Sequence, residues 1–146
     1  MRIYTRIFLL FGWSTVLFAG LTPVGQWESV GRDDLSPTLI QVYKRQGQYF
    51  GKIVRLARKS GRPTARLCIH CQGDLYRKPL LGMVILRGLQ QVADKQYQKG
   101  YILDPRDGKD YRCQLTLSNN GQQLKVHGYI GLPIFGKTVY WQRAKL

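Results

Sequence analysis

The chain contains few of the residues from which most catalytic centres are built. Its 146 residues include only 8 Asp and Glu, 2 His and 3 Cys. The acidic side chains cluster in turn-like stretches, at Asp33-Asp34 and between Asp104 and Asp110, where Asp is expected for its local hydrogen bonds. No Ser-His-Asp order and no phosphate-cradling glycine loop is visible. The sequence therefore offers little support for paired-carboxylate catalysis, requires no cofactor, and favours a function other than that of an enzyme.

A hydrophobic run long enough to cross a membrane is also missing. The uncharged apolar stretch Ile7 to Gly20 falls short of the ~20 residues that a spanning helix needs. It follows Arg2 and Arg6, an order that is typical of a signal peptide. We expect residues 1–20 to be removed on export to the periplasm or beyond, which leaves a domain over 21–146. An uncleaved N-terminal anchor is the alternative.

The chain is strongly basic, with 23 Lys and Arg and a net charge of +15. Such a surface attracts polyanions, but an exported protein is not expected to meet nucleic acid. The charge then indicates an anionic envelope lipid or glycan as a partner, or simply a solvated face. The basic residues that flank the first two cysteines are Lys52, Arg55, Arg58, Lys59, Arg62, Arg66, Arg77 and Lys78.

Alternation of apolar and polar residues, rather than a helical period, dominates the chain. The clearest case is the hairpin from Gly100 to Leu117, in which Asp104, Pro105 and Gly108 form a turn. After the turn, Tyr111, Cys113, Leu115 and Leu117 alternate with polar residues, as in a half-buried strand. Further strands are expected over 37–45, 48–58, 80–89, 122–130 and 137–143, with a bulge or bend at Gly51, a polar turn over 94–100 and a long loop over 59–78.

Together these segments make about eight strands with short turns and no convincing helix. This pattern predicts an all-β fold, a single up-and-down antiparallel β-barrel. A barrel of this size holds either its own side chains or one small ligand.

Several short motifs resemble one family of exported bacterial proteins, domain of unknown function 2147. They run in unbroken order from Gly25-x-Trp27 to Trp141-x-Arg143, and include Tyr49-Phe50-Gly51-Lys52, Lys78-Pro79-Leu80-Leu81-Gly82, Gly108-Lys109-x-Tyr111-x-Cys113, and Phe135-Gly136-x-Thr138. The family is similar to lipocalins, so the resemblance implies an eight-stranded, calycin-type barrel in an exported protein. It also implies that Trp27 closes one barrel end and that Arg143 packs across it, a structural role.

Cys68-Ile69-His70-Cys71 is the most reactive-looking motif. Two cysteines at this spacing resemble the site of a thiol-disulfide oxidoreductase, but no strand-helix-strand pattern surrounds them. In an exported protein the favoured interpretation is a disulfide between Cys68 and Cys71 that staples the loop. A zinc site that adds His70 with His127 or Cys113 lacks a second close pair of ligands. Cys113 is expected to be a buried, free thiol.

Three classes of function stay open. The first is a carrier of a small apolar or amphipathic ligand. The second is an envelope- or protein-interaction module with a filled barrel and a basic face. The third is the oxidoreductase. For the carrier, the candidate ligand-binding side chains at the rim or interior are Tyr43, Tyr49, Tyr111 and Tyr129.

Overall fold

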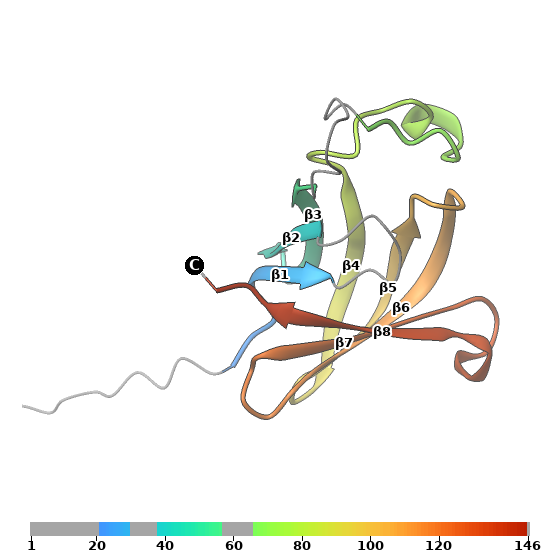
Figure 1. The fold of residues 1–146 in the computed structure, drawn as a ribbon. Helices are drawn as coiled ribbons and strands as arrows, with labels where there is room; N and C mark the ends of the chain where they lie inside the picture. The colour runs from blue at the N-terminus through green and yellow to red at the C-terminus, as the bar shows by residue number, and fades with distance from the viewer. Residues whose placement is uncertain (1–20, 30–37, 57–65, 146) are drawn as a thin grey trace, which may run out of the picture.

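The protein folds as one closed antiparallel barrel, which confirms the all-β prediction (Figure 1). The computed structural model describes residues 21–29, 38–56 and 66–145. Each strand pairs with the next, and β1 also pairs with β8, so that the sheet has no open edge. The strands are β1 Gly25–Ser29, β2 Thr38–Arg45, β3 Gln48–Arg55, β4 Val84–Ala93, β5 Gln96–Asp104, β6 Lys109–Leu117, β7 Gln123–Tyr129 and β8 Lys137–Arg143, with single 3₁₀ turns η1 Gly73–Leu75 and η2 Pro133–Phe135.

The barrel interior is a packed core. Alternate residues of each strand point inward, and Trp27, Leu86 and Leu124 have no exposed surface. Tyr49 and Tyr97 meet edge to face at 4.8 Å between ring centroids, which fills the centre further. The other inward side chains that are almost fully buried include Ile40, Val42, Ile53, Leu89, Cys113, Leu115, Leu117, Val126 and Trp141.

The structure also shows which face of β3 is inward, a choice that its two apolar faces left open. Tyr49 and Ile53 are buried, and Gly51 lies between them in the same phase. The pairing of β3 with β4 shifts register on both sides of Gly51. The irregularity that the sequence predicts at this glycine is therefore present.

Two predicted boundaries were wrong. The strand expected over 80–89 is β4, which begins at Val84 and ends at Ala93. The stretch expected to be a turn over 94–100 is mostly β5, which begins at Gln96. Lys95, in the tight turn between β4 and β5, has a positive φ angle of 57°, and Lys99, within β5, has one of 67°. Lysines therefore occupy two positions where glycine or asparagine would be expected.

One end of the barrel is closed by Arg143, whose guanidinium lies 4.3 Å from the centre of the Trp27 ring. The same group donates hydrogen bonds to the carbonyls of Thr22, Val24 and Gly121 at 2.8, 2.9 and 2.7 Å. Partial burial lowers the pKa of Arg143. Gly25 has a φ of 135°, and a Cβ there would lie 2.6 Å from the Arg143 Nη1 atom, which explains the glycine of Gly25-x-Trp27.

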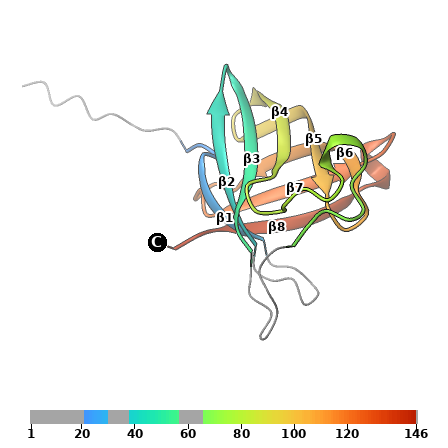
Figure 2. The same ribbon diagram turned by 90° about the horizontal axis from the view of Figure 1, so that it is seen from above.

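The opposite end carries the segment from Arg66 to Met83, the disulfide loop, which lies over the ends of β5 and β6 (Figure 2). The loop doubles back on itself. The amide of Cys68 donates to the carbonyl of Lys78, and the amide of Arg77 donates to the carbonyl of Cys68, both at 2.9 Å. One 3₁₀ turn, η1, lies at its tip. The described part of the loop that the sequence predicts over 59–78, from Arg66 onward, fits this arrangement.

Candidate ligand-binding cleft at the disulfide end of the barrel

The disulfide loop is stapled by the predicted bond. Cys68 and Cys71 are joined, with their Cα atoms 5.4 Å apart. Both residues are buried, with 1% and 4% of their surface exposed. The Cys68 sulfur also lies 3.8 Å from the carbonyl oxygen of Pro105 in the β5–β6 turn. The bond therefore closes a tight bend within the loop, and the bonded pair packs against the turn.

The β5–β6 turn has the shape that the sequence predicts. The amide of Gly108 donates to the carbonyl of Asp104 at 2.8 Å, and Gly108 has a φ of 72°. Arg106 donates to the Asp104 carboxylate from its backbone at 2.9 Å and from its guanidinium at 2.8 Å. Burial alone would raise the pKa of Asp104, but the hydrogen bonds and charge of Arg106 outweigh it, so that the pKa lies below its ordinary value.

The Asp107 carboxylate organises the second half of this turn. It accepts hydrogen bonds from the amide of Lys109 at 2.9 Å and from the hydroxyl of Tyr111. This hydrogen bond is the main reason that the pKa of Tyr111 rises to about 12. Tyr111 therefore stays a neutral donor that supports the turn.

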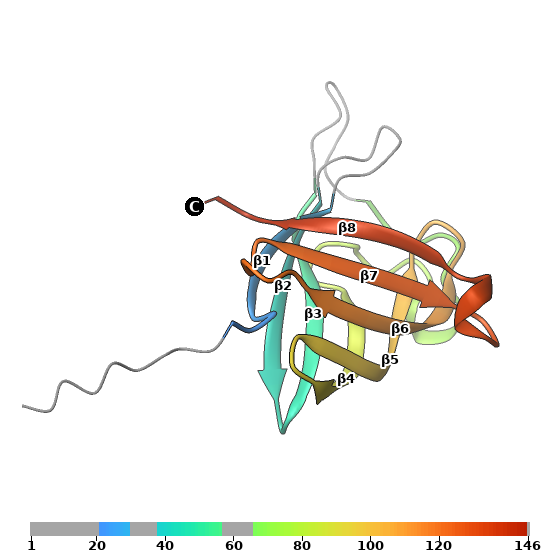
Figure 3. The ribbon, with the colours of Figure 1, turned by 90° about the horizontal axis from the view of Figure 1, so that it is seen from below.

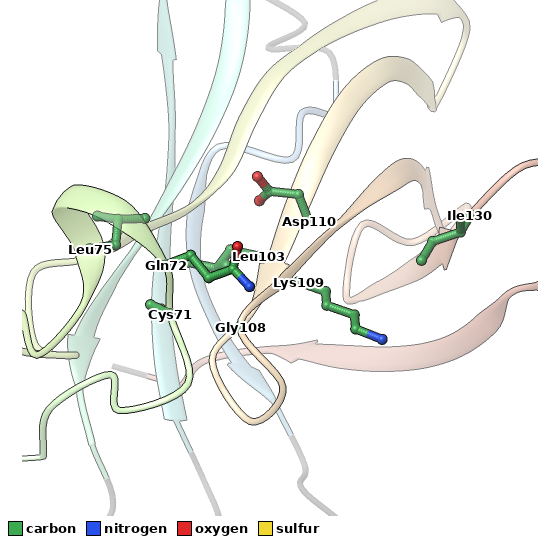
Figure 4. Close-up of a pocket in the computed structure, with 8 residues that line it drawn as sticks. All are labelled: Cys71, Gln72, Leu75, Leu103, Gly108, Lys109, Asp110 and Ile130. Carbon is green, nitrogen blue, oxygen red and sulfur yellow. The ribbon is translucent and has the colours of Figure 1, made fainter.

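A cleft of about 360 Å³ opens between the disulfide loop, the β5–β6 turn and the end of β7 (Figure 4). Leu75 comes from η1 on one side, Ile130 follows β7 on the other, and the buried side chain of Leu103 lies between them. The remaining lining residues are Cys71, Gln72, Gly108, Lys109 and Asp110. The volume is at the lower end of the range for small-molecule sites, which is ~300–1,000 Å³.

The polar groups of the cleft are not equivalent. Asp110 accepts a hydrogen bond from Arg87, whose positive charge offsets its own. Among the residues with described positions, Lys109 makes no ion pair. The cleft therefore combines three apolar side chains with a larger polar surface, which includes the Gln72 amide, the paired Asp110 carboxylate and one ammonium group. This combination suits an amphipathic molecule with an anionic end.

A second depression, of about 460 Å³, lies on the other side of Leu75. Its walls are more apolar, and the charges at its border belong to Lys78 and Arg87. The other residues that line it are Pro79, Leu81, Gly82, Met83 and Val84.

The four tyrosines proposed as a ligand site do not come together. Tyr49 is buried inside the barrel, and Tyr111 has the inward phase but lies at the β5–β6 turn. Tyr43 and Tyr129 point to the outside of the barrel. There Tyr43 stacks on Phe50, and Tyr129 stacks on His127. Strand alternation explains the split, because residues of opposite phase face opposite sides of the sheet. No tyrosine lines the cleft.

The thiols are placed for stability rather than for exchange. Cys113 is a free, buried cysteine, and burial raises its pKa to about 12. A thiol this hard to ionise is a poor nucleophile, and the joined pair Cys68–Cys71 is itself buried. Within residues 21–29, 38–56 and 66–145, no group of three or more His, Cys, Asp and Glu side chains is placed to hold a metal ion.

The described basic residues around the cysteines lie on β3 and on the disulfide loop. Lys52 lies on the outer face of β3, 5.9 Å from the centre of the Tyr43 ring. Arg55 pairs with Glu28 at 3.7 Å. Arg77 and Lys78 are exposed on the disulfide loop, whereas 57–65, with three of the basic residues, lies outside the described residues.

The proposed signal peptide, residues 1–20, also lies outside the described residues. In the part of the chain that is described, no helix has the length and hydrophobicity needed to cross a membrane.

Sequence reasoning missed most of the cleft. Leu75, Leu103 and Ile130 come from three separate segments, and each has an ordinary role in its own segment. The one sequence feature that could have indicated the cleft was the hairpin, because Lys109 and Asp110 directly follow a turn that lies at a barrel mouth.

The closed eight-stranded barrel and the loop over its mouth define the class of protein, a lipocalin-like β-barrel. The fold is similar to that of HP1028 from Helicobacter pylori, described as belonging to the lipocalin family, with a TM-score of 0.75, 20% sequence identity, and coverage of 86% of this chain and 84% of that one. The chain belongs to the family described as "Uncharacterized protein conserved in bacteria (DUF2147)", whose model matches residues 25–143. No curated protein matches it significantly.

Proposed function

We propose that this chain is an exported, lipocalin-like binding protein that takes a small amphipathic ligand with an anionic end. The observation that carries the proposal is the cleft of about 360 Å³ at the disulfide end of the barrel. Leu75, Leu103 and Ile130 contact the apolar part of the ligand, and the Lys109 ammonium attracts its charged end. Asp110 does not oppose an anion strongly, because Arg87 pairs with it.

The cleft, and not the barrel interior, is the binding site in this proposal. Lipocalin-like barrels have room for one small ligand only where inward side chains leave space. Here Trp27, Leu86, Leu89 and Leu124 have no exposed surface, so the interior is full. A ligand bound there would have to displace core side chains, at a cost of several kcal/mol.

Export is supported by the charged and then apolar start of the chain. The Cys68–Cys71 bond adds a second argument, since disulfides persist mainly in oxidising compartments. N-terminal sequencing of the protein recovered from the cell envelope tests this part of the proposal. A chain that starts near residue 21 would support it, and an intact Met1 in the cytoplasm would contradict it.

Binding of decanoate and decanol tests the ligand class, because the two molecules differ mainly in charge. Titration calorimetry should show that Leu75→Trp, which fills the cleft, weakens both at least about tenfold. Lys109→Glu should weaken decanoate only, and the control Lys125→Glu, an exposed site on β7, should change neither. Unchanged binding to the Leu75→Trp variant would overturn the proposal. If the proposal holds, mass spectrometry of molecules that co-purify from the envelope would identify the natural ligand.

A further inference from the structure

The connection between β7 and β8 presents four large apolar side chains to solvent. Ile130, Leu132, Ile134 and Phe135, which we name the apolar tip, are 58%, 63%, 82% and 76% exposed. The connection projects beyond the body of the barrel (Figures 1 and 3). Single exposed apolar residues are common, but a contiguous group of four in six residues indicates an interaction site.

The tip is held in this shape by hydrogen bonds of its own. The amide of Phe135 donates to the carbonyl of Leu132 at 3.0 Å, which closes η2. His127 on β7 reaches the carbonyl of Pro133 with its Nε2 atom at 2.6 Å, and its Nδ1 atom lies 2.8 Å from the Thr138 hydroxyl. The side chains of His127 and Thr138 therefore help to fix a loop whose apolar residues are exposed to solvent.

Three cations surround the tip. Lys137 follows it after Gly136 and pairs in register with Gly128 on β7. Arg112 lies opposite Tyr129 at the end of β7, and Lys109 shares the cleft with Ile130. None of the ion pairs between described residues involves any of the three.

The nearby carboxylates do not cancel this charge. Asp104 is paired with Arg106, although the charge of Lys137 also acts on it, and Asp110 is paired with Arg87. Asp107 is the remaining acid of the turn, and it accepts hydrogen bonds from Tyr111 and from the Lys109 amide. The surroundings of the apolar tip are thus positive, as is the chain as a whole with its net charge of +15.

We propose that the apolar tip inserts into the surface of an anionic lipid bilayer while Lys109, Arg112 and Lys137 contact the headgroup phosphates. Short apolar elements bind bilayers through buried apolar area together with attraction of basic residues to anionic lipid, and this loop supplies both. A second copy of the chain is a poorer occupant, because two such basic surfaces repel each other. The proposal goes beyond ligand binding, since it assigns a location and an orientation to the protein.

The thiol chemistry of the chain allows a local test. Cys113 is buried and Cys68 is bonded to Cys71, so an environment-sensitive fluorophore will react selectively with Ile134→Cys in the full chain. Asn119→Cys, in the turn at the opposite barrel end, is the matched control. Vesicles of phosphatidylglycerol and phosphatidylcholine should shift the emission of the label at 134 to the blue, with no shift at 119. Phosphatidylcholine alone or high salt should reduce the shift severalfold.

A second measurement tests the side chains themselves. Ile134→Ser with Phe135→Ser should lower partition onto anionic vesicles at least about tenfold. The control pair Val24→Ser with Val92→Ser removes apolar residues that are 39% and 42% exposed elsewhere, and should change partition less than about twofold. Binding to vesicles without a shift at 134, equal shifts at 134 and 119, or equal losses in both pairs would overturn the proposal. A shift at 134 that appears only with a second copy or an envelope protein would also overturn it, in favour of a protein partner.

Discussion

Gly108 of the β5–β6 turn lies directly beneath the carbonyl group of His70 in the disulfide loop. A Cβ atom built on Gly108 would overlap the backbone of His70 and contact the amide of Cys71. Two segments that are more than thirty residues apart are thus packed backbone to backbone, and the cleft is formed at their edge. The glycine is needed for its φ of 72° and, independently, for its lack of a side chain.

Gly108→Ala should therefore lower the free energy of unfolding by about 3–5 kcal/mol, through backbone strain and steric overlap together. Gly47→Ala is the control, because Gly47 has a similar φ of 77° but no atom within 4 Å of the added Cβ. It should cost only about 1 kcal/mol. Urea denaturation of both variants measures the difference, and equal losses would show that the His70 contact is unimportant.

Arg143→Ala should destabilise the barrel by about 2–4 kcal/mol, because it removes three hydrogen bonds to carbonyls and the stacking on Trp27. Arg143→Lys should recover less than half of the loss, since a lysine lacks the planar fork that reaches three carbonyls at once. Thermal and urea unfolding provide the values. Full recovery by lysine would mean that charge alone is required there.

The thiol count should distinguish a staple from a reactive site. Native protein should take up no alkylating reagent, unfolded protein one equivalent at Cys113, and reduced unfolded protein three. Cys113 resists in the native state because burial raises its pKa to about 12. Mass spectrometry reads all three states. Rapid exchange of the native disulfide with glutathione would contradict the assignment.

The Asp104–Arg106 pair should make the β5–β6 turn sensitive to acid. The folded-state pKa of Asp104 is lowered, so its stabilisation is fully present above the unfolded pKa and is lost as the pH falls through the folded value. Asp104→Asn should cost about 0.5–1.5 kcal/mol near neutral pH, a figure that allows for the exposure of Arg106. The cost should shrink below about pH 4. An equal cost at both pH values would exclude a role for the charge.

The fold could be predicted because most of its information is local. In the Gly100–Leu117 hairpin, the turn residues and the alternation of Cys113, Leu115 and Leu117 specify both the bend and the buried face. The strand that was misread, β5, hides Tyr97 between Gln96 and Gln98. It also makes its turn with Lys95, a residue that carries no turn signal.

The candidate site was harder to predict because it depends on contacts between distant segments. The order of Tyr43, Tyr49, Tyr111 and Tyr129 along the chain does not reveal which face of the sheet each occupies, and they divide between the two faces. The apolar tip has no period, and its support by His127 through Pro133 is visible only in three dimensions.

The β1–β8 seam has a consequence for how the protein folds. It joins strands from the two ends of the domain through only three residue pairs, whereas the other strand pairings link neighbours in sequence. Closing so long a chain segment costs more entropy than forming a hairpin, so we expect the seam to form last. Trp27 and Trp141 both lie at this seam and are buried. In a chain with Trp13→Phe, tryptophan emission will therefore report the closure of the barrel together with the β1–β2 and β7–β8 pairings in which these residues also lie.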